Sequence, residues 1–134
     1  MKTKAIIEKG KDGTFGIYTP DTDYTIIGEG KTVKEAKEDF LNSAREMADY
    51  YRAKGKALPE ELETLAFDFS YDVSALFDAY PLINVTQFAK AIGINPVLMR
   101  QYKAGTTYIS AERKKQIEEF IHTIGQQMCE FSIA

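Results

Sequence analysis

The sequence predicts an α+β fold in which a small sheet with one covering helix is followed by an all-α region. Strand patterns occur four times, at residues 3–9, 14–19, 24–28 and 65–72. A long helical stripe of apolar residues separates the third strand segment from the fourth. After Asp72, apolar residues recur only at helical spacing. We therefore expect a β-β-β-α-β domain in residues 1–72 and a helical domain in residues 73–134.

The strand segments are marked by their residue types and by the turns that separate them. The first contains Ala5, Ile6 and Ile7, and the turn sequence Gly10-Lys11-Asp12-Gly13 follows it, which predicts a hairpin with the second. The last segment alternates between large apolar and smaller or polar residues. That period of two is typical of a strand with one buried face.

The first long helix is predicted at residues 32–54. Thr32 with Glu35 three residues later forms a capping box, and Gly55 can end the helix. Its apolar residues share one face: Val33, Ala36, Phe40, Ala44, Met47, Ala48 and Tyr51. We expect this face to pack on the sheet, with a groove for a partner as the alternative. Residues 55–63, which include Pro59, are expected to be a polar linker.

Four further helices are predicted from their caps and stops. Asp72 can cap a short helix over residues 73–80, and a second at residues 85–92 is ended by Gly93. Asn95 can cap a third that begins with Pro96 and is ended by Gly105. Ser110 can cap a long helix to about Cys129. This last helix suits a dimer contact or a cap on the helical bundle.

The charge is unevenly distributed. The chain has 134 residues and a net charge of −3. Residues 1–83 carry 11 Lys/Arg and 16 Asp/Glu, whereas residues 84–134 carry 6 and 4. Within residues 84–115, the six basic residues face a single acidic one, Glu112. A basic region on an acidic chain is expected where one end binds a polyanion, and an ordinary solvated surface is the alternative.

Other features exclude several protein classes. The lone Cys129 and the single His122 argue against a disulfide framework and a structural metal site. No Ser/His/Asp or Cys/His arrangement and no glycine-rich phosphate loop is present, so we expect neither an enzyme nor a cofactor. No apolar run reaches the length of a membrane helix or a signal peptide, which predicts a cytoplasmic protein without membrane contact.

The segment from Val85 to Gly105 predicts a helix-turn-helix unit, because two short helices are joined there by a tight turn. Ala89 is small enough for the second helix to cross the first closely, and Gly93 can adopt the positive φ of a sharp helix end. With Met99 and Tyr102 turned inward, the opposite side of the second helix can enter the major groove of double-stranded DNA. The alternative is a helical hairpin used only for packing or dimerisation.

The candidate DNA contacts follow from this orientation. Arg100 and Gln101 have the side-chain types that make bidentate contacts with guanine and adenine. The predicted interface comprises Lys90, Asn95, Pro96, Val97, Arg100, Gln101, Lys103, Thr106 and Thr107. Of these, Lys90, Lys103, Thr106 and Thr107, together with Lys114 or Lys115, are expected to reach phosphates, which fixes register without reading bases.

Taken together, the two halves resemble the HicB-type antitoxins of bacterial toxin–antitoxin systems. The N-terminal resemblance lies in Ala5–Lys9, Asp12–Tyr18, Thr19-Pro20-Asp21 and Ile27–Ala36, and the C-terminal one in Phe88–Gly105. Thr22-Asp23-Tyr24-Thr25 replaces a Leu-Pro-Gly-Cys-like run of the family. The resemblance implies a partial RNase H-like fold that binds a HicA-like mRNA-cleaving toxin, a helix-turn-helix that represses the operon, and a homodimer or higher oligomer.

Two other functions remain open at this stage. A stand-alone transcription regulator would use the N-terminal domain to sense a ligand or a protein. A metal-dependent nuclease would need several converging carboxylates. The acidic candidates are Glu8, Asp12, Asp21, Asp23, Asp68 and Asp72. Several of them lie in predicted turns, where acidic residues serve local roles, so a scattered acidic surface is the favoured interpretation.

Overall fold

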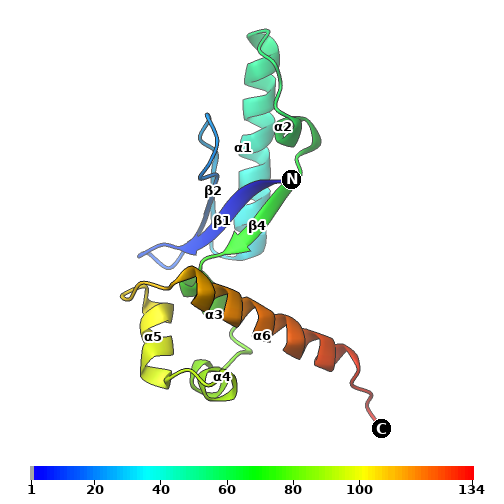
Figure 1. Ribbon diagram of the computed structural model, residues 1–134. Helices are drawn as coiled ribbons and strands as arrows, with labels where there is room; N and C mark the ends of the chain where they lie inside the picture. The colour runs from blue at the N-terminus through cyan, green and yellow to red at the C-terminus, as the bar shows by residue number, and fades with distance from the viewer. Residues whose placement is uncertain (1) are drawn as a thin grey trace. The chain divides into compact units, whose positions relative to one another are not determined.

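The computed structural model describes residues 2–134, which form two compact units, one ending at Tyr80 and the other spanning Pro81–Ala134. The chain is α+β: within the described residues it has a four-stranded mixed sheet and six helices (Figure 1). None of the helices in residues 2–134 is both long enough and apolar enough to cross a membrane.

The sheet of the first unit contains four short strands. They are β1 (Thr3–Lys9), β2 (Phe15–Tyr18), β3 (Ile27–Gly30) and β4 (Phe67–Tyr71). Their order in the sheet is β3-β2-β1-β4. β1 and β2 form the predicted antiparallel hairpin, β2 and β3 are also antiparallel, and β4 runs parallel to β1.

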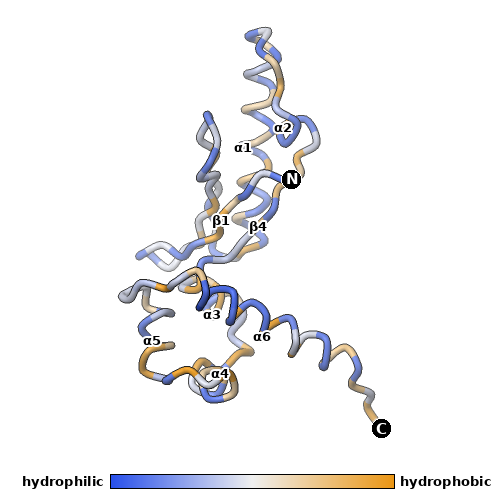
Figure 2. The backbone as a smooth tube through the Cα atoms, in the orientation of Figure 1, coloured by the Kyte–Doolittle hydropathy of each residue, from blue (hydrophilic) through white to orange (hydrophobic). Residues whose placement is uncertain are grey.

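Helix α1 (Val33–Ala53) packs along one face of this sheet (Figure 1). The predicted cap is confirmed, because the Thr32 hydroxyl accepts the Glu35 N–H at 3.1 Å. Phe40 lies at the centre of the packed face, with its ring 4.9 Å from that of Phe67 and 5.7 Å from that of Phe69, both on β4. Figure 2 shows hydrophobic residues in the middle of β1, where Ala5 and Ile7 are fully buried. The apolar face of α1 is therefore core, as predicted.

Two glycines on β3 allow α1 to approach the sheet. A Cβ on Gly28 would lie 2.4 Å from the backbone nitrogen of Phe40, and one on Gly30 would lie 2.6 Å from that of Ala36. The third strand was predicted at residues 24–28, but the observed strand is Ile27–Gly30. The strand is shifted because the two glycines, and not the buried Tyr24 and Ile26, pair with β2.

A short helix, α2 (Glu60–Thr64), occupies part of the predicted polar linker, so that prediction is wrong for these residues. Leu62 explains the difference, because its side chain is buried to 1% exposure in the core of the first unit. The neighbouring Glu61 accepts a hydrogen bond of 2.6 Å from the Tyr24 hydroxyl. A tertiary contact thus orders a segment whose composition is that of a loop.

Helix α3 (Val73–Ala79) was expected at the start of the helical domain, and it is capped by Asp72 as predicted. Its contacts, however, are with β1 and β4 of the first unit. Lys9 on β1 forms an ion pair of 3.4 Å with Asp78, and the Asp72 N–H donates to the Ile7 carbonyl at 2.8 Å. The boundary between the compact units consequently follows Tyr80 and not Asp72.

Candidate nucleic-acid interface

The second unit contains α4 (Val85–Ile92), α5 (Pro96–Ala104) and α6 (Ala111–Cys129). The start of α4 is fixed by Asn84, whose side chain accepts the Gln87 N–H at 3.0 Å. Its end is fixed by Gly93, which has a φ of 84°. The N–H groups of Gly93 and Ile94 both donate to the Ala89 carbonyl, at 3.0 and 2.9 Å. This hydrogen-bonded, left-handed end turns the chain sharply.

Only Gly93, Ile94 and Asn95 separate α4 from α5. Asn95 caps α5, with its side chain accepting the Val97 N–H at 2.8 Å, and Pro96 occupies the first helical position. At the other end, Gly105 has a φ of 73° and ends the helix. A three-residue turn that contains glycine between two short helices is typical of helix-turn-helix units.

The inner side of this pair of helices forms a small core. Met99 is fully buried and Tyr102 is 5% exposed, which confirms the inward orientation predicted for both. Ala89 is also fully buried, as expected of a small residue at a helix crossing. Phe88 packs edge-on against Phe120 of α6, with ring centroids 5.4 Å apart. The orientation of α5 is therefore fixed by the burial of Met99 and Tyr102.

The opposite side of α5 presents Val97, Arg100 and Gln101, all of which are exposed. The Arg100 guanidinium donates a hydrogen bond of 3.1 Å to the Thr86 hydroxyl on α4. Sequence reasoning did not identify Thr86, because its role depends on the crossing of two helices and not on local spacing. Arg100 is thereby held over the α4–α5 pair with other N–H donors available for a ligand.

Gln101 is linked to the loop that follows α5. Its backbone carbonyl accepts hydrogen bonds from the N–H and the hydroxyl of Thr106, at 3.1 and 3.3 Å. Its side-chain oxygen accepts the Thr107 hydroxyl at 3.2 Å. Thr106 and Thr107 were expected to reach phosphates, whereas in the free chain their hydroxyls bond to Gln101. Their direct effect is to orient Gln101 on the exposed side of α5.

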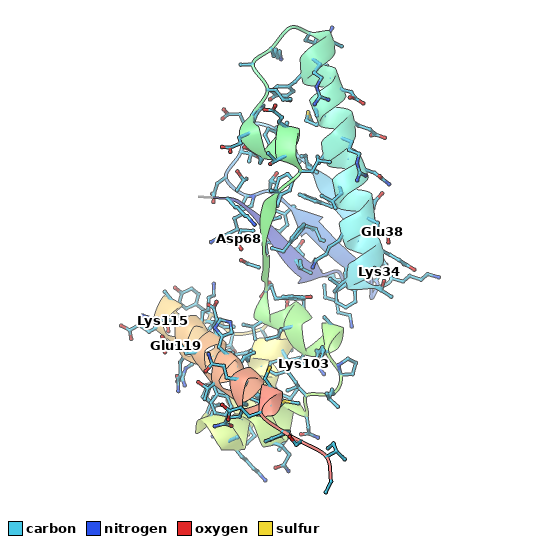
Figure 3. The ribbon with its side chains drawn as sticks, turned by 90° about the vertical axis from the view of Figure 1, so that its right-hand side faces the viewer. Lys34, Glu38, Asp68, Lys103, Lys115 and Glu119 are labelled. Atoms are coloured by element: carbon cyan, nitrogen blue, oxygen red, sulfur yellow. The ribbon has the colours of Figure 1, made fainter. Side chains whose placement is uncertain are left out.

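The basic residues surround this face unevenly. Lys90 and Lys114 are exposed, and Lys103 is half-buried on α5 (Figure 3). Lys115 lies 3.9 Å from Glu119 on the same helix, an exposed i,i+4 pair that phosphate can compete with. The exposed Tyr108, at 85% of its full surface, follows Thr107 and was not identified from the sequence. Its only sequence signal is its place in the polar loop between Gly105 and Ser110.

The first unit offers a different surface. The sheet face opposite α1 carries a row of side chains that strand register aligns: Ile27, Tyr18, Ile6 and Ser70. Ile27 is 54% exposed. Burial, and then the nearby carboxylates of Glu8 and Asp72, raise the pKa of Tyr18 above its usual value. Asp68 on β4 points away from α1, on this same side (Figure 3). Lys4, which pairs with Asp68 in the strand register, also lies on this side, so the row is bordered by charges of both signs. An apolar row of this kind is suited to contact with a protein.

Two of the acidic residues considered for a nuclease, Asp12 and Asp72, have local structural roles. Asp12 accepts hydrogen bonds from the hydroxyl and the N–H of Thr14, at 2.7 and 3.1 Å, and these bonds lower the pKa of its carboxyl. Asp72 caps α3. Within residues 2–134, no group of three or more His, Cys, Asp or Glu side chains is arranged to hold a metal ion.

Comparisons of this chain with protein-family models, with curated proteins and with solved structures find no match.

Proposed function

We propose that this chain is a cytoplasmic antitoxin-type regulator, which represses its own operon through α4 and α5 and neutralises a HicA-like toxin through its first unit. One observation carries the DNA-binding part. Packing of Met99 and Tyr102 turns Arg100 and Gln101 outward on a short helix that follows a three-residue turn. These two side chains are suited to base edges, and the basic residues around them are suited to phosphates.

The partner-binding part is supported by the charge and the open sheet face of the first unit. Residues 1–83 carry five more acidic than basic residues, which favours a basic partner such as a small RNA-cleaving toxin. The resemblance to HicB-type antitoxins implies a partial RNase H-like fold. The element order supports it, because three strands and the long α1 precede β4, with only the short α2 added between them. The row of Ile27, Tyr18 and Ile6 is the candidate contact surface.

The DNA-binding part is tested with the double variant Arg100→Ala/Gln101→Ala and the DNA upstream of this reading frame. Loss of two bidentate contacts is expected to reduce specific affinity by about 100-fold, measured by fluorescence anisotropy at fixed salt. Binding of the wild-type chain should weaken steeply as salt increases, because counterions are released from DNA.

The matched control is Lys34→Ala on α1, which removes one positive charge from an exposed position on the first unit. This variant should bind the same DNA as the wild-type chain does. Circular dichroism establishes that each variant is folded. Unchanged affinity of the double variant would show that α5 does not read the DNA.

The partner-binding part is tested by co-expression of the chain with the product of the adjacent reading frame, followed by a pull-down. We expect a short basic protein to be retained, and Ile27→Lys to release it while DNA binding persists. Retention of no neighbouring protein, together with intact DNA binding, would instead identify a stand-alone transcription regulator.

A further inference from the structure

The predicted DNA contacts of the second unit are rich in hydrogen-bond donors. They include the basic side chains of Lys90, Arg100 and Lys103 and no carboxylate. Ammonium and guanidinium groups donate hydrogen bonds but cannot accept them. Among the predicted contacts, side-chain carbonyl oxygens occur only at Asn95 and Gln101. Whether this surface can accept a hydrogen bond from a base therefore depends mainly on these two amides.

Both amide oxygens are bonded within the chain. Asn95 Oδ1 accepts the Val97 N–H at 2.8 Å, as the cap of α5. Gln101 Oε1 accepts the Thr107 hydroxyl at 3.2 Å, in the loop that follows the helix. Because the amide group is planar and trigonal, turning Oε1 toward Thr107 turns Nε2 away from it. The exposed end of Gln101 therefore offers the two N–H donors of Nε2.

The loop that carries Thr107 is itself anchored to α5. Gly105, with a φ of 73°, turns the chain back toward the helix. The N–H and the hydroxyl of Thr106 then donate to the Gln101 carbonyl, at 3.1 and 3.3 Å. Thr107 is half-buried. The hydroxyl that bonds to Oε1 is thus placed by the turn at Gly105, which fixes the orientation of the Gln101 amide before any DNA is bound.

This orientation separates guanine from adenine. A bidentate contact with adenine needs an acceptor for the N6 amino group and a donor for N7, side by side. Guanine presents two acceptors, N7 and O6, to the major groove. An amide whose oxygen is turned toward the loop can donate to guanine, but it would leave the amino group of adenine without a partner.

We propose that Gln101 reads guanine and not adenine, and that Thr107 is the positioning residue that makes this choice. The inference rests on the proposed DNA-binding function and names the DNA that this surface prefers: half-sites with guanine at the base pair that Gln101 contacts. Arg100, the neighbouring residue on the same exposed side, also offers only donors. The two adjacent positions consequently favour base edges that present acceptors.

The test is selection of bound duplexes from a pool of randomised DNA by the full chain, followed by sequencing. Gln101→Ala identifies the base pair concerned, because the preference should be lost there alone. At that position, the wild-type chain should favour guanine over adenine about tenfold or more. Thr107→Val keeps the shape of the side chain but removes the hydroxyl. It should therefore release Oε1 and enrich adenine to within about threefold of guanine.

Two variants serve as controls for Thr107→Val. Thr107→Ser retains the hydroxyl and should retain the preference for guanine. Thr123→Val makes the same substitution on α6, where the lost hydroxyl donates to the Glu119 carbonyl at 2.9 Å, and it should select the wild-type sequence. Circular dichroism establishes that each variant is folded.

A modified base tests the contact directly. Replacement of the selected guanine by 7-deazaguanine, which carries a C–H in place of the N7 acceptor, should weaken binding of the wild-type chain about tenfold in fluorescence anisotropy. The affinity of Gln101→Ala should not change, because this variant makes no contact with the base.

The possible failures are distinguishable. Adenine at the position that Gln101→Ala identifies would overturn this inference and leave the DNA-binding proposal standing. A preference that Thr107→Val does not change, with affinity reduced equally for all sequences, would also overturn it and would show that Thr107 contacts a phosphate. A pool in which no sequence is enriched would contradict the DNA-binding proposal itself, and this inference with it.

Discussion

The two long helices begin alike and are used differently. α1 has 21 residues and α6 has 19, and each is capped by a hydroxyl that accepts a backbone N–H at 3.1 Å. α1 buries Ala36, Phe40, Ala44 and Ala48 along its whole length, whereas α6 buries Ile117 alone. An amphipathic pattern therefore predicts that a face will be covered without specifying whether the same chain covers it.

Two glycines, one next to each helix or within it, show the same difference between α1 and α6. Gly28 lies under α1, in contact with the backbone at Ala36 and Phe40, and Gly125 lies within α6 with open space around it. The close approach of α1 explains the first glycine, whereas packing within the chain gives no reason for the second.

The largest expected effect is that of Gly28→Ala. The new methyl group would lie 2.4 Å from the Phe40 nitrogen and 2.6 Å from the Ala36 carbonyl oxygen, and neither backbone atom can move without displacing α1. We expect the free energy of unfolding of the first unit to fall by about 3 kcal/mol, measured by urea unfolding.

Gly16→Ala is the matched control, since Gly16 lies on the neighbouring β2 and its nearest atom is the Cγ of Glu8 at 3.9 Å. Its free energy of unfolding should remain within about 0.5 kcal/mol of the wild-type value. Equal losses for the two substitutions would mean that the effect comes from the strand and not from the close approach of α1.

A smaller effect on the free energy of unfolding is expected at alkaline pH. It comes from Tyr24, which contacts the C-terminal half of α1. The Tyr24 ring packs edge-on against Tyr51 of α1, with centroids 6.3 Å apart, and its hydroxyl donates to Glu61. Burial first, and then this hydrogen bond, raise the pKa of the Tyr24 phenol above that of the unfolded chain. The protonated form is thus favoured by folding, and its contribution to stability is lost as pH rises above the unfolded pKa of about 10.

Above about pH 10, the free energy of unfolding should consequently decrease less steeply with pH for Tyr24→Phe than for the wild-type chain. Urea unfolding at a series of pH values provides the measurement. Tyr50→Phe, which removes an exposed phenol from α1, should keep the wild-type slope. A Tyr24→Phe profile parallel to the wild-type profile would exclude Tyr24 as the source of the alkaline loss.

Local signals were sufficient for most elements. The Asn95 cap and the left-handed stops predicted α4 and α5 correctly, because Gly93, Asn95 and Gly105 act within a few residues of their own positions. The same signals could not predict α2, which one buried leucine orders, or the contacts of α3 with the first unit.

In the candidate site, the sequence predicted which side of α5 faces outward but not how its residues are linked. Periodicity was enough to place Met99 and Tyr102 inside. The bond from Arg100 to Thr86 joins positions 14 residues apart on two helices, and the bond from Thr107 to Gln101 crosses the turn at Gly105. Such contacts depend on where side chains lie after folding, and residue spacing alone does not predict this.

The smallest expected effect comes from the two caps, which test whether α1 and α6 differ in stability along their lengths. Thr32→Ala and Ser110→Ala each remove one hydroxyl acceptor, at a cost of about 1 kcal/mol. Because α1 is packed throughout, Thr32→Ala should accelerate hydrogen exchange evenly along α1, through unfolding of the whole unit. Ser110→Ala should accelerate exchange most in residues 125–129, because these residues are exposed whereas Ile117 is buried and Phe120 packs against Phe88. Equal acceleration along both helices would mean that the last turns of α6 are also held by contacts within the chain.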